Sequence, residues 1–322
     1  MHRRMLGGLT ACLLALAAAS PAIAAEASPT PEDLVQGVTT DSVSPDSVDA
    51  DGSFVSETST AVQSFDASDG TLTVTPTDDS EATAVSIGLP IPDDSDVEAL
   101  DDGSLHFASA SAPDDNVFVQ QLEDGSVRSI TTIPSADAAT SFVFPVELAE
   151  NQQLTSTSDG GVVIAEDVAN GDIVEVASAA APWAVDANGV NLPTWYEVTE
   201  SSIVQHVDVE GAAFPVLADP TFTRSGVKVT VPGYGGKIAS AYLNKGWTSD
   251  LRAGNTAVCA IAAALAGLAT AGAGTALGIG CAAAAGASSV LSNHGYCLAL
   301  DLRAIVPRPK VMQRWYKDSW CR

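Results

Sequence analysis

Short runs rich in Val, Ile, Leu and Phe recur between residues 61 and 219, separated by polar segments, and such runs are typical of β-strands. Asp-Gly and Asn-Gly pairs separate the runs, and these pairs readily adopt the positive φ angles that tight hairpins need. The pattern therefore predicts an antiparallel, all-β domain. The runs with the clearest strand character are 72–74, 116–119, 127–130, 142–144, 162–164 and 173–176.

The pattern changes at residues 256–291, where no side chain carries a formal charge and Ala and Gly predominate. Ala favours helix, and the glycine-rich segment 272–274 interrupts it. This stretch therefore predicts two short helices folded back on each other. Residues 297–302 and 311–316 predict two strands joined by a proline-containing turn, so the chain ends in a β-hairpin.

The segment that precedes the helical pair predicts mixed local structure. Residues 227–231 alternate as a strand does, and residues 237–245 predict a short helix that stops at Gly246. Thr248 or Ser249 is expected to cap the next helix. The expected fold class is α+β: an antiparallel all-β domain, followed by a small disulfide-tied helical hairpin plus β-hairpin module.

The first residues are typical of a secretory signal peptide. Arg3 and Arg4 precede an apolar run, and a small-residue site follows near Ala24. Residues 25–60 are rich in Ser, Thr, Asp and Pro and poor in large apolar residues, which predicts a disordered acidic linker. The predicted division is 1–24 signal peptide, 25–60 linker, 61–220 acidic β-rich domain and 221–322 basic Gly/Ala-rich disulfide module.

The charges divide sharply at this last boundary. Residues 25–220 contain 37 Asp and Glu and one base, Arg128, whereas residues 221–322 contain 11 Lys and Arg and three Asp. Such asymmetry between two halves points to an acidic region and a basic region that seeks an anionic surface. Opposite charges on tethered parts also attract, so we expect an intramolecular contact between them.

Four cysteines remain after the predicted cleavage: Cys259, Cys281, Cys297 and Cys321. An even number in an exported chain favours disulfides over metal ligands or a reactive thiol. The terminal hairpin would bring Cys297 and Cys321 together, which leaves Cys259 for Cys281. The sequence alone does not choose among the connectivities that four cysteines allow.

Residues 181–198, APWAVDANGVNLPTWYEV, predict a hairpin around Asn188-Gly189, and the segment Phe-Pro-Val-Leu-Ala-Asp-Pro follows at 214–220. This order of motifs, followed by a Gly/Ala-rich tail that contains cysteines, resembles exported actinobacterial proteins of unknown function. The resemblance covers residues 182–322. It implies secretion and a two-part plan, and it implies no reaction.

The sequence contains no G-x-S-x-G, H-E-x-x-H, P-loop or kinase motif. His206 alternates with apolar residues, which places it on the polar face of a strand. His294 and Cys297 have loosely zinc-like spacing, but export favours a disulfide. The aspartate-rich turns complete no Ca²⁺-binding loop. We therefore predict a non-enzymatic protein without a metal or cofactor.

Basic and aromatic residues flank the uncharged helical pair and form the candidate surface-binding set. Trp and Tyr favour the membrane interface, and Lys and Arg favour anionic lipid. The alternative is that the aromatic residues form the core of the module. The candidates are Lys245, Trp247, Arg252, Arg308, Lys310, Arg314, Trp315, Lys317, Trp320 and Arg322.

The helical pair allows two interpretations, a buried hairpin or membrane contact through its closely spaced small residues. The leading functional hypothesis is a secreted protein whose basic module engages an anionic membrane or envelope surface, as a bacteriocin-like peptide does, while the acidic domain carries or masks it. One alternative is a structural or adhesive protein of the cell wall. The other is an exported enzyme with a site in the β-domain. No nucleic-acid partner is expected.

Overall fold

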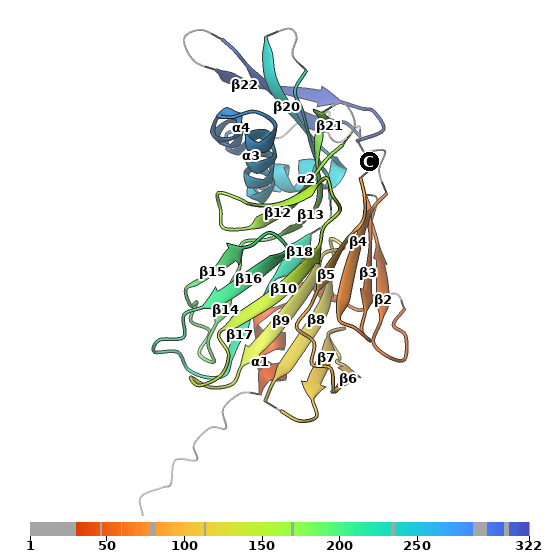
Figure 1. Ribbon diagram of the computed structural model, residues 1–322, viewed down its shortest axis with the longest axis vertical. Helices are drawn as coiled ribbons and strands as arrows, with labels where there is room; N and C mark the ends of the chain where they lie inside the picture. The colour runs from red at the N-terminus through yellow and green to blue at the C-terminus, as the bar shows by residue number, and fades with distance from the viewer. Residues whose placement is uncertain are drawn as a thin grey trace, which may run out of the picture.

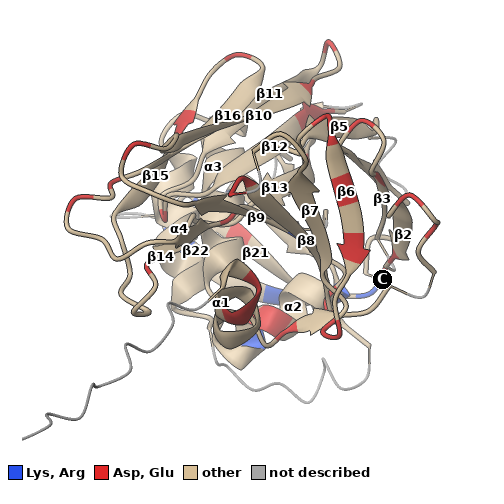
Figure 2. Ribbon diagram, turned by 90° about the horizontal axis from the view of Figure 1, so that it is seen from below, with Lys and Arg blue, Asp and Glu red and all other residues tan. Residues whose placement is uncertain are grey.

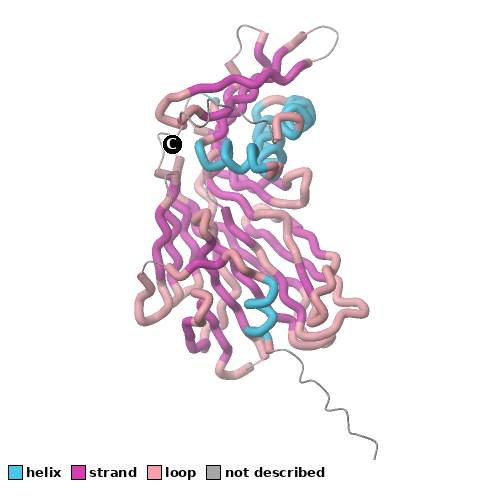
Figure 3. The backbone as a smooth tube through the Cα atoms, turned by 180° about the vertical axis from the view of Figure 1, so that it is seen from behind, coloured by secondary structure: helices cyan, strands magenta, loops and turns pink. Residues whose placement is uncertain are grey.

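The computed structural model describes residues 30–45, 47–58, 60–77, 82–112, 114–168, 171–223, 225–232, 236–285, 295–305 and 309–321. Antiparallel strands dominate this part of the chain, and its helices are short (Figure 1). The helices α2, α3 and α4 gather at one end, as the view from behind also shows (Figure 3). The signal peptide predicted for residues 1–24 lies outside the described residues.

The strands form one 15-stranded and one 7-stranded sheet. The smaller sheet has the order β15-β16-β10-β5-β4-β3-β2. The larger sheet follows the path β22-β21-β20-β19-β13-β18-β9-β8-β7-β6, and β1, β11, β12, β14 and β17 pair beside it.

The helices are α1 (Pro31–Val38), α2 (Lys245–Ala253), α3 (Ala257–Ala269) and α4 (Ala273–Ala282). The first strands are β1 (Ser42–Val43), β2 (Phe54–Glu57), β3 (Ala61–Asp66), β4 (Thr71–Pro76), β5 (Val85–Gly88), β6 (Ser95–Ala99), β7 (Leu105–Ser109), β8 (Asn116–Leu122), β9 (Val127–Ile133), β10 (Ser141–Glu147) and β11 (Gln152–Ser156). The others are β12 (Val162–Asp167), β13 (Ile173–Ala179), β14 (Ala184–Val185), β15 (Thr194–Val198), β16 (Ser202–Val207), β17 (Val216–Ala218), β18 (Thr221–Thr223), β19 (Val227–Thr230), β20 (Lys237–Leu243), β21 (Cys297–Arg303) and β22 (Lys310–Tyr316).

The predicted antiparallel β-structure is confirmed, and each of the six runs with clear strand character lies within a strand. Burial alternates along β3 and β4, as expected for strands with one face on a core. The two sheets enclose one shared core. Across it, Phe65 meets Phe107 with ring centroids 5.9 Å apart, and Phe144 meets Phe222 at 6.0 Å.

The large sheet continues across residue 220, where the sequence predicted a boundary between two domains. Strand β13 of the acidic part pairs with both β18 and β19 of the basic part. The Glu175 carboxylate on β13 is 1% exposed. It accepts hydrogen bonds from the Val227 backbone N–H at 3.1 Å and from Trp247 Nε1 at 3.0 Å. The acidic and basic parts therefore share hydrogen bonds and a sheet.

The N-terminal segment predicted as a disordered linker is folded where it is described. Helix α1 begins with a capping box, in which Thr30 Oγ1 accepts from the Asp33 backbone N–H at 3.2 Å. Its Val35 side chain is fully buried beside Phe118 and Ile130. Asp41 forms an ion pair with Arg128 at 2.8 Å. The few apolar residues of this segment are sufficient because they dock on an existing sheet.

The hairpin predicted around Asn188-Gly189 forms only as a short one. Val185 and Asn191 make an isolated antiparallel bridge, and the Leu192 backbone N–H donates to the Ala184 carbonyl at 2.9 Å. The longer pairing of residues 183–185 with residues 194–198 does not form. Strand β14 pairs with β17, and β15 pairs with β16. The Asp-Ala-Asn-Gly turn itself forms, since Asp186 Oδ1 accepts from the Asn188 and Val190 backbone N–H groups at 2.9 Å each. The local turn chemistry was therefore right, but the two flanking segments find other partners.

The short helix predicted at residues 237–245 is wrong, because residues 237–243 form strand β20 and helix α2 begins only at Lys245. Ala239, Ala241 and Leu243 are fully buried, so this segment has a period of two. The helix that follows is capped by Asn244, whose Oδ1 accepts from the Trp247 backbone N–H at 2.9 Å, and not by Thr248 or Ser249. The strand predicted at residues 227–231 is confirmed as β19.

The uncharged segment forms the predicted pair of short helices, α3 and α4, with the turn at Gly272. Gly274 lies where the helices are closest, and a Cβ atom there would collide with the carbonyl oxygen of Ala263. One side of the pair packs on β13 and β19–β22 through Val258, Leu265 and Leu277, all fully buried. The terminal hairpin of β21 and β22 also forms as predicted.

Two disulfides join Cys259 to Cys281 and Cys297 to Cys321. The first bridge ties α3 to α4, and the second ties the start of β21 to the end of the chain. Both pairings agree with the arrangement that the sequence favoured. Disulfides persist in oxidising compartments, so the structure fits an extracellular-like environment.

Removal of either bridge should destabilise the protein by about 3 kcal/mol, because each closes a loop of similar length. The sequence separations are 22 residues for Cys259–Cys281 and 24 for Cys297–Cys321. The double variants Cys259→Ala/Cys281→Ala and Cys297→Ala/Cys321→Ala should therefore show similar decreases in the urea midpoint of unfolding. An unchanged midpoint for one of them would show that its bridge contributes nothing.

Candidate functional site

Five basic side chains lie on one face of the strands β19 to β22, and we call this surface the basic outer face. Strand alternation separates it from the opposite face, which packs on the helices through Leu298, Leu300 and Leu302. The cross-strand register places Lys237 opposite Arg303, and Arg303 opposite Lys310. The five side chains are Lys228, Lys237, Arg303, Lys310 and Arg314.

Asp301 lies at the centre of this face with its side chain 2% exposed. Its carboxylate is 3.0 Å from Lys237 Nζ, 3.4 Å from Arg314 Nε and 3.6 Å from Arg303 Nη2. The Ser240 hydroxyl also donates to it at 2.8 Å. Three cations around one carboxylate leave a local excess of positive charge, because one anion neutralises only one of them.

The ionisation of these groups is set by the same contacts. Burial opposes ionisation of the Asp301 carboxyl, but the hydrogen bond from Ser240 and the nearby Lys237 and Arg314 cations outweigh it, so its pKa lies below the ordinary value. Burial also opposes the charge on Arg314, yet Tyr242 and Asp301 raise the pKa of its guanidinium. Asp301 and Arg314 are therefore both charged at neutral pH.

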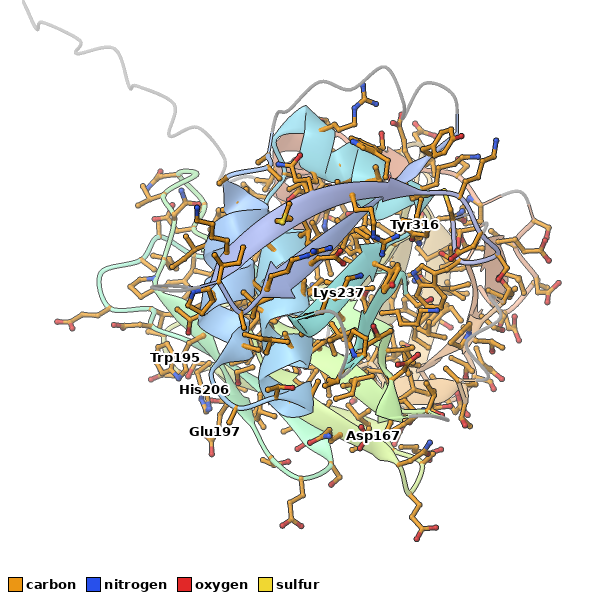
Figure 4. The ribbon with its side chains drawn as sticks, turned by 90° about the horizontal axis from the view of Figure 1, so that it is seen from above. Asp167, Trp195, Glu197, His206, Lys237 and Tyr316 are labelled. Carbon is orange, nitrogen blue, oxygen red and sulfur yellow. A yellow bond between two sulfur atoms is a disulfide. The ribbon has the colours of Figure 1, made fainter. Side chains whose placement is uncertain are left out.

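Aromatic rings hold several of the cations in place. Lys228 Nζ lies 4.7 Å from the ring centroid of Trp320 and 5.7 Å from that of Tyr242. The Arg314 guanidinium lies 5.2 Å from the Tyr242 centroid. Tyr316 fixes the aromatic group, because its hydroxyl donates to the Leu243 carbonyl at 2.7 Å. Figure 4 looks onto this end of the molecule and labels Lys237 and Tyr316.

The candidate residues from the sequence are only partly brought together. Lys310 and Arg314 lie on the basic outer face, whereas Trp315 faces the helices and packs in their core. Lys245 and Arg252 lie on α2. Lys317 lies beside the Tyr296 ring, 5.5 Å from its centroid.

Two of the aromatic candidates cannot contact a partner surface as predicted. Trp247 is 4% exposed and Trp320 is 3% exposed, because both rings fill cores around β19–β21. The alternative interpretation, in which the aromatic residues form a core, is correct for these two. Arg308 and Arg322 lie outside the described residues.

Sequence reasoning missed Lys228, Lys237 and Arg303. The alternation in Val227-Lys228-Val229 indicated that Lys228 points away from the core, but not which strand lies beside it. Lys237 was hidden by the incorrect helix prediction. Their shared face follows from the pairing of β19, β20 and β21, which connects segments far apart in the chain.

The helical pair is buried on one side and open on the other. Its outer side and the turn at residues 155–158 line an open groove of about 690 Å³. Ile279 in this groove is 68% exposed. Within the described part of the chain, no helix is long and apolar enough to cross a membrane.

The described residues contain no cluster of three or more His, Cys, Asp or Glu side chains suited to a metal ion. Comparison with protein-family models, curated proteins and solved structures found no match for this chain. The resemblance to exported actinobacterial proteins therefore stays a prediction from the sequence.

Proposed function

We propose that this protein is an exported, non-enzymatic protein that attaches to an anionic cell-envelope surface through its basic outer face. The observation that supports the proposal is the set of five cations on one face of β19–β22, with the single buried carboxylate of Asp301 among them. Side chains held by strands and aromatic rings lose little conformational freedom on binding, which favours contact with a charged polymer.

The distribution of charge supports an oriented mode of attachment. The basic outer face lies at one end of the long axis, formed by β19 to β22 (Figure 1). Acidic residues are spread over loops, strand β6 and helix α1 in the view from the other end (Figure 2). Such a separation produces a field that turns the basic end toward an anionic surface and the acidic body away from it.

The geometry favours attachment without membrane permeation. The two uncharged helices have 13 and 10 residues, and a spanning helix needs about 20 apolar residues. The disulfide between Cys259 and Cys281 holds them together, and one side is buried against the sheet. Between the two surface hypotheses, we therefore favour a wall-associated protein over a bacteriocin-like one.

The binding test uses the mature chain, residues 25–322, with isolated bacterial cell walls that retain their phosphate polymers. Arg303→Gln/Lys310→Gln removes two charges and leaves Asp301 paired with Lys237 and Arg314. If each charge contributes about 1 kcal/mol near an anionic surface, the affinity should fall roughly 30-fold. Sedimentation with the walls, repeated at increasing salt, measures this change.

The matched control is Lys245→Gln/Arg252→Gln, which removes the same charge from α2. It should bind nearly as the unmodified protein does, and thermal unfolding would show that both variants are folded. Equal losses in the two variants would indicate attraction by net charge alone and contradict a specific face. Dye-loaded phosphatidylglycerol vesicles serve as a second surface, on which leakage would favour the bacteriocin-like hypothesis instead.

A further inference from the structure

A second surface site lies on the smaller sheet, on the solvent side of β10, β16 and β15. The register pairs Ser141 with His206 and His206 with Trp195, so the three side chains form a row across the strands. Glu197 lies two residues beyond Trp195 on the same face. Figure 4 shows Trp195, Glu197 and His206 close together at the edge of the molecule. We call these four residues the Trp195 platform.

Hydrogen bonds and stacking fix the Trp195 platform. Ser141 Oγ lies 2.8 Å from His206 Nδ1, and His206 Nε2 lies 3.0 Å from Glu197 Oε2. In the neutral imidazole, Nε2–H donates to the carboxylate and Nδ1 accepts from the serine hydroxyl. The Trp195 ring stacks on the imidazole, with centroids 5.4 Å apart and planes 22° apart. The orientation of the indole is therefore set before any ligand binds.

Much of the indole is nevertheless open to solvent. Trp195 is 52% exposed, and β15 is the last strand of its sheet. The Glu197 side chain is 65% exposed, so its second oxygen can accept a further hydrogen bond. A pre-oriented planar ring beside hydroxyl and carboxylate groups matches a ligand with one flat C–H face and a rim of hydroxyl groups. A pyranose sugar has this shape.

The acidic residues around the platform disfavour negatively charged polysaccharides. Arg128 is the only base between residues 25 and 220, and it is buried and paired with Asp41. Glu200, Asp208 and Glu210 lie in the turns on either side of β16. Uronate and phosphate polymers would be repelled from this part of the surface, whereas a neutral polysaccharide would not.

We infer that the Trp195 platform binds a neutral polysaccharide of β-linked pyranose units, with one sugar ring stacked on the free side of the indole. In such polymers the equatorial substituents leave an apolar C–H face for the ring contact. Glu197 accepts a hydrogen bond from a sugar hydroxyl. His206 is held against the indole by its hydrogen bonds with Ser141 and Glu197. This site is independent of the basic outer face and gives the protein a second contact with a polymer surface.

The Ser141–His206–Glu197 chain serves orientation and not nucleophilic attack. A serine nucleophile needs backbone N–H groups that can stabilise an oxyanion beside it. The backbone of β10 is instead engaged in pairing with β16 around Ser141, and the hydroxyl lies on an exposed sheet face.

Native electrophoresis of residues 25–322 through gels containing hydroxyethyl cellulose should show retardation that depends on polysaccharide concentration. Trp195→Ala should weaken this binding about tenfold or more, because a stacked aromatic contact contributes on this scale. Val143→Ala is the matched control, since Val143 lies on the same face and is also 52% exposed. It should leave the retardation unchanged, as should Arg303→Gln/Lys310→Gln.

Alginate replaces the neutral polymer in a parallel gel, where Trp195→Ala should have no effect. The inference is overturned if hydroxyethyl cellulose causes no retardation, or if Trp195→Ala is retarded as strongly as the unmodified protein. The inference is also overturned if the unmodified protein hydrolyses p-nitrophenyl acetate and Ser141→Ala abolishes this activity, because the platform would then be catalytic. Failure of the wall-binding test leaves these outcomes unaffected, since that test concerns a different face.

Discussion

Replacing Trp247 by alanine is expected to lower the free energy of unfolding by about 3–5 kcal/mol, the range for large aromatic residues in cores. Trp247 is 4% exposed and packs in the cluster that joins α2 to β19–β21. Its Nε1–H also donates to the buried Glu175 carboxylate at 3.0 Å. The alanine variant would leave a cavity and remove a donor from a buried anion, and both changes destabilise the folded state.

Urea unfolding measures this loss of stability. One further variant separates the hydrogen bond from the cavity, and another is a control at an exposed tryptophan. Trp247→Phe keeps most of the ring and removes the donor, so it should cost about 1.5–3 kcal/mol, the range for a hydrogen bond to a charged group. Trp195→Ala changes an exposed indole and should shift stability by no more than about 0.5 kcal/mol. If Trp247→Ala and Trp195→Ala unfold at the same midpoint, the central role of Trp247 is refuted.

Asp219 should make the protein less stable as the pH rises. The side chain is fully buried, and burial raises the pKa of its carboxyl to about 7. Hydrogen bonds from the Trp183 backbone N–H and the Thr221 hydroxyl offset this only in part. The folded state thus keeps a proton that the unfolded chain loses near its ordinary pKa of 3.8. The contribution of this group to the free energy of unfolding is fully present at low pH. It decreases as the pH rises and is lost by about pH 7, a total change of about 4 kcal/mol.

Asp219→Asn tests this directly, because the amide stays neutral at every pH. The free energy of unfolding of the variant, minus that of the unmodified protein, should increase by up to about 4 kcal/mol between pH 4 and pH 8. Taking the difference removes the contributions of the other carboxylates. Asp208→Asn, at an exposed position, is the matched control. Parallel pH profiles for Asp219→Asn and the unmodified protein would rule out a proton held at Asp219.

Local signals in the sequence were enough to predict the elements, but not how they pair. Short apolar runs between turn dipeptides identified β8, β9, β12 and β13, and the Ala/Gly composition identified the helical pair. The segments around Asn188-Gly189 were paired with each other because the turn between them was clear. In the fold, β14 pairs with β17, where Val185 and Leu217 are buried opposite each other, and β15 pairs with the next strand, β16. Which strands pair depends on contacts between segments far apart in the chain, and a local sequence pattern does not contain this information.

The candidate site shows the same limit. The sequence located the basic residues in the last third of the chain, and two of its candidates, Lys310 and Arg314, lie on the basic outer face. It could not distinguish the two faces of the terminal strands, so Trp315, on the helix side, was grouped with Arg314. It also could not anticipate that Glu175, far away in the acidic part, would accept a hydrogen bond from the buried Trp247 ring.

The position of β13, between strands on both sides of residue 220, constrains the order in which the protein can fold. Its backbone remains unpaired on one edge until residues 221–230 have been synthesised and β18 and β19 arrive. An apolar strand with a free edge readily joins a strand of another molecule. The emerging chain is therefore exposed to aggregation until β18 and β19 close this edge of the sheet, which favours rapid synthesis of residues 180–230 or protection by a chaperone.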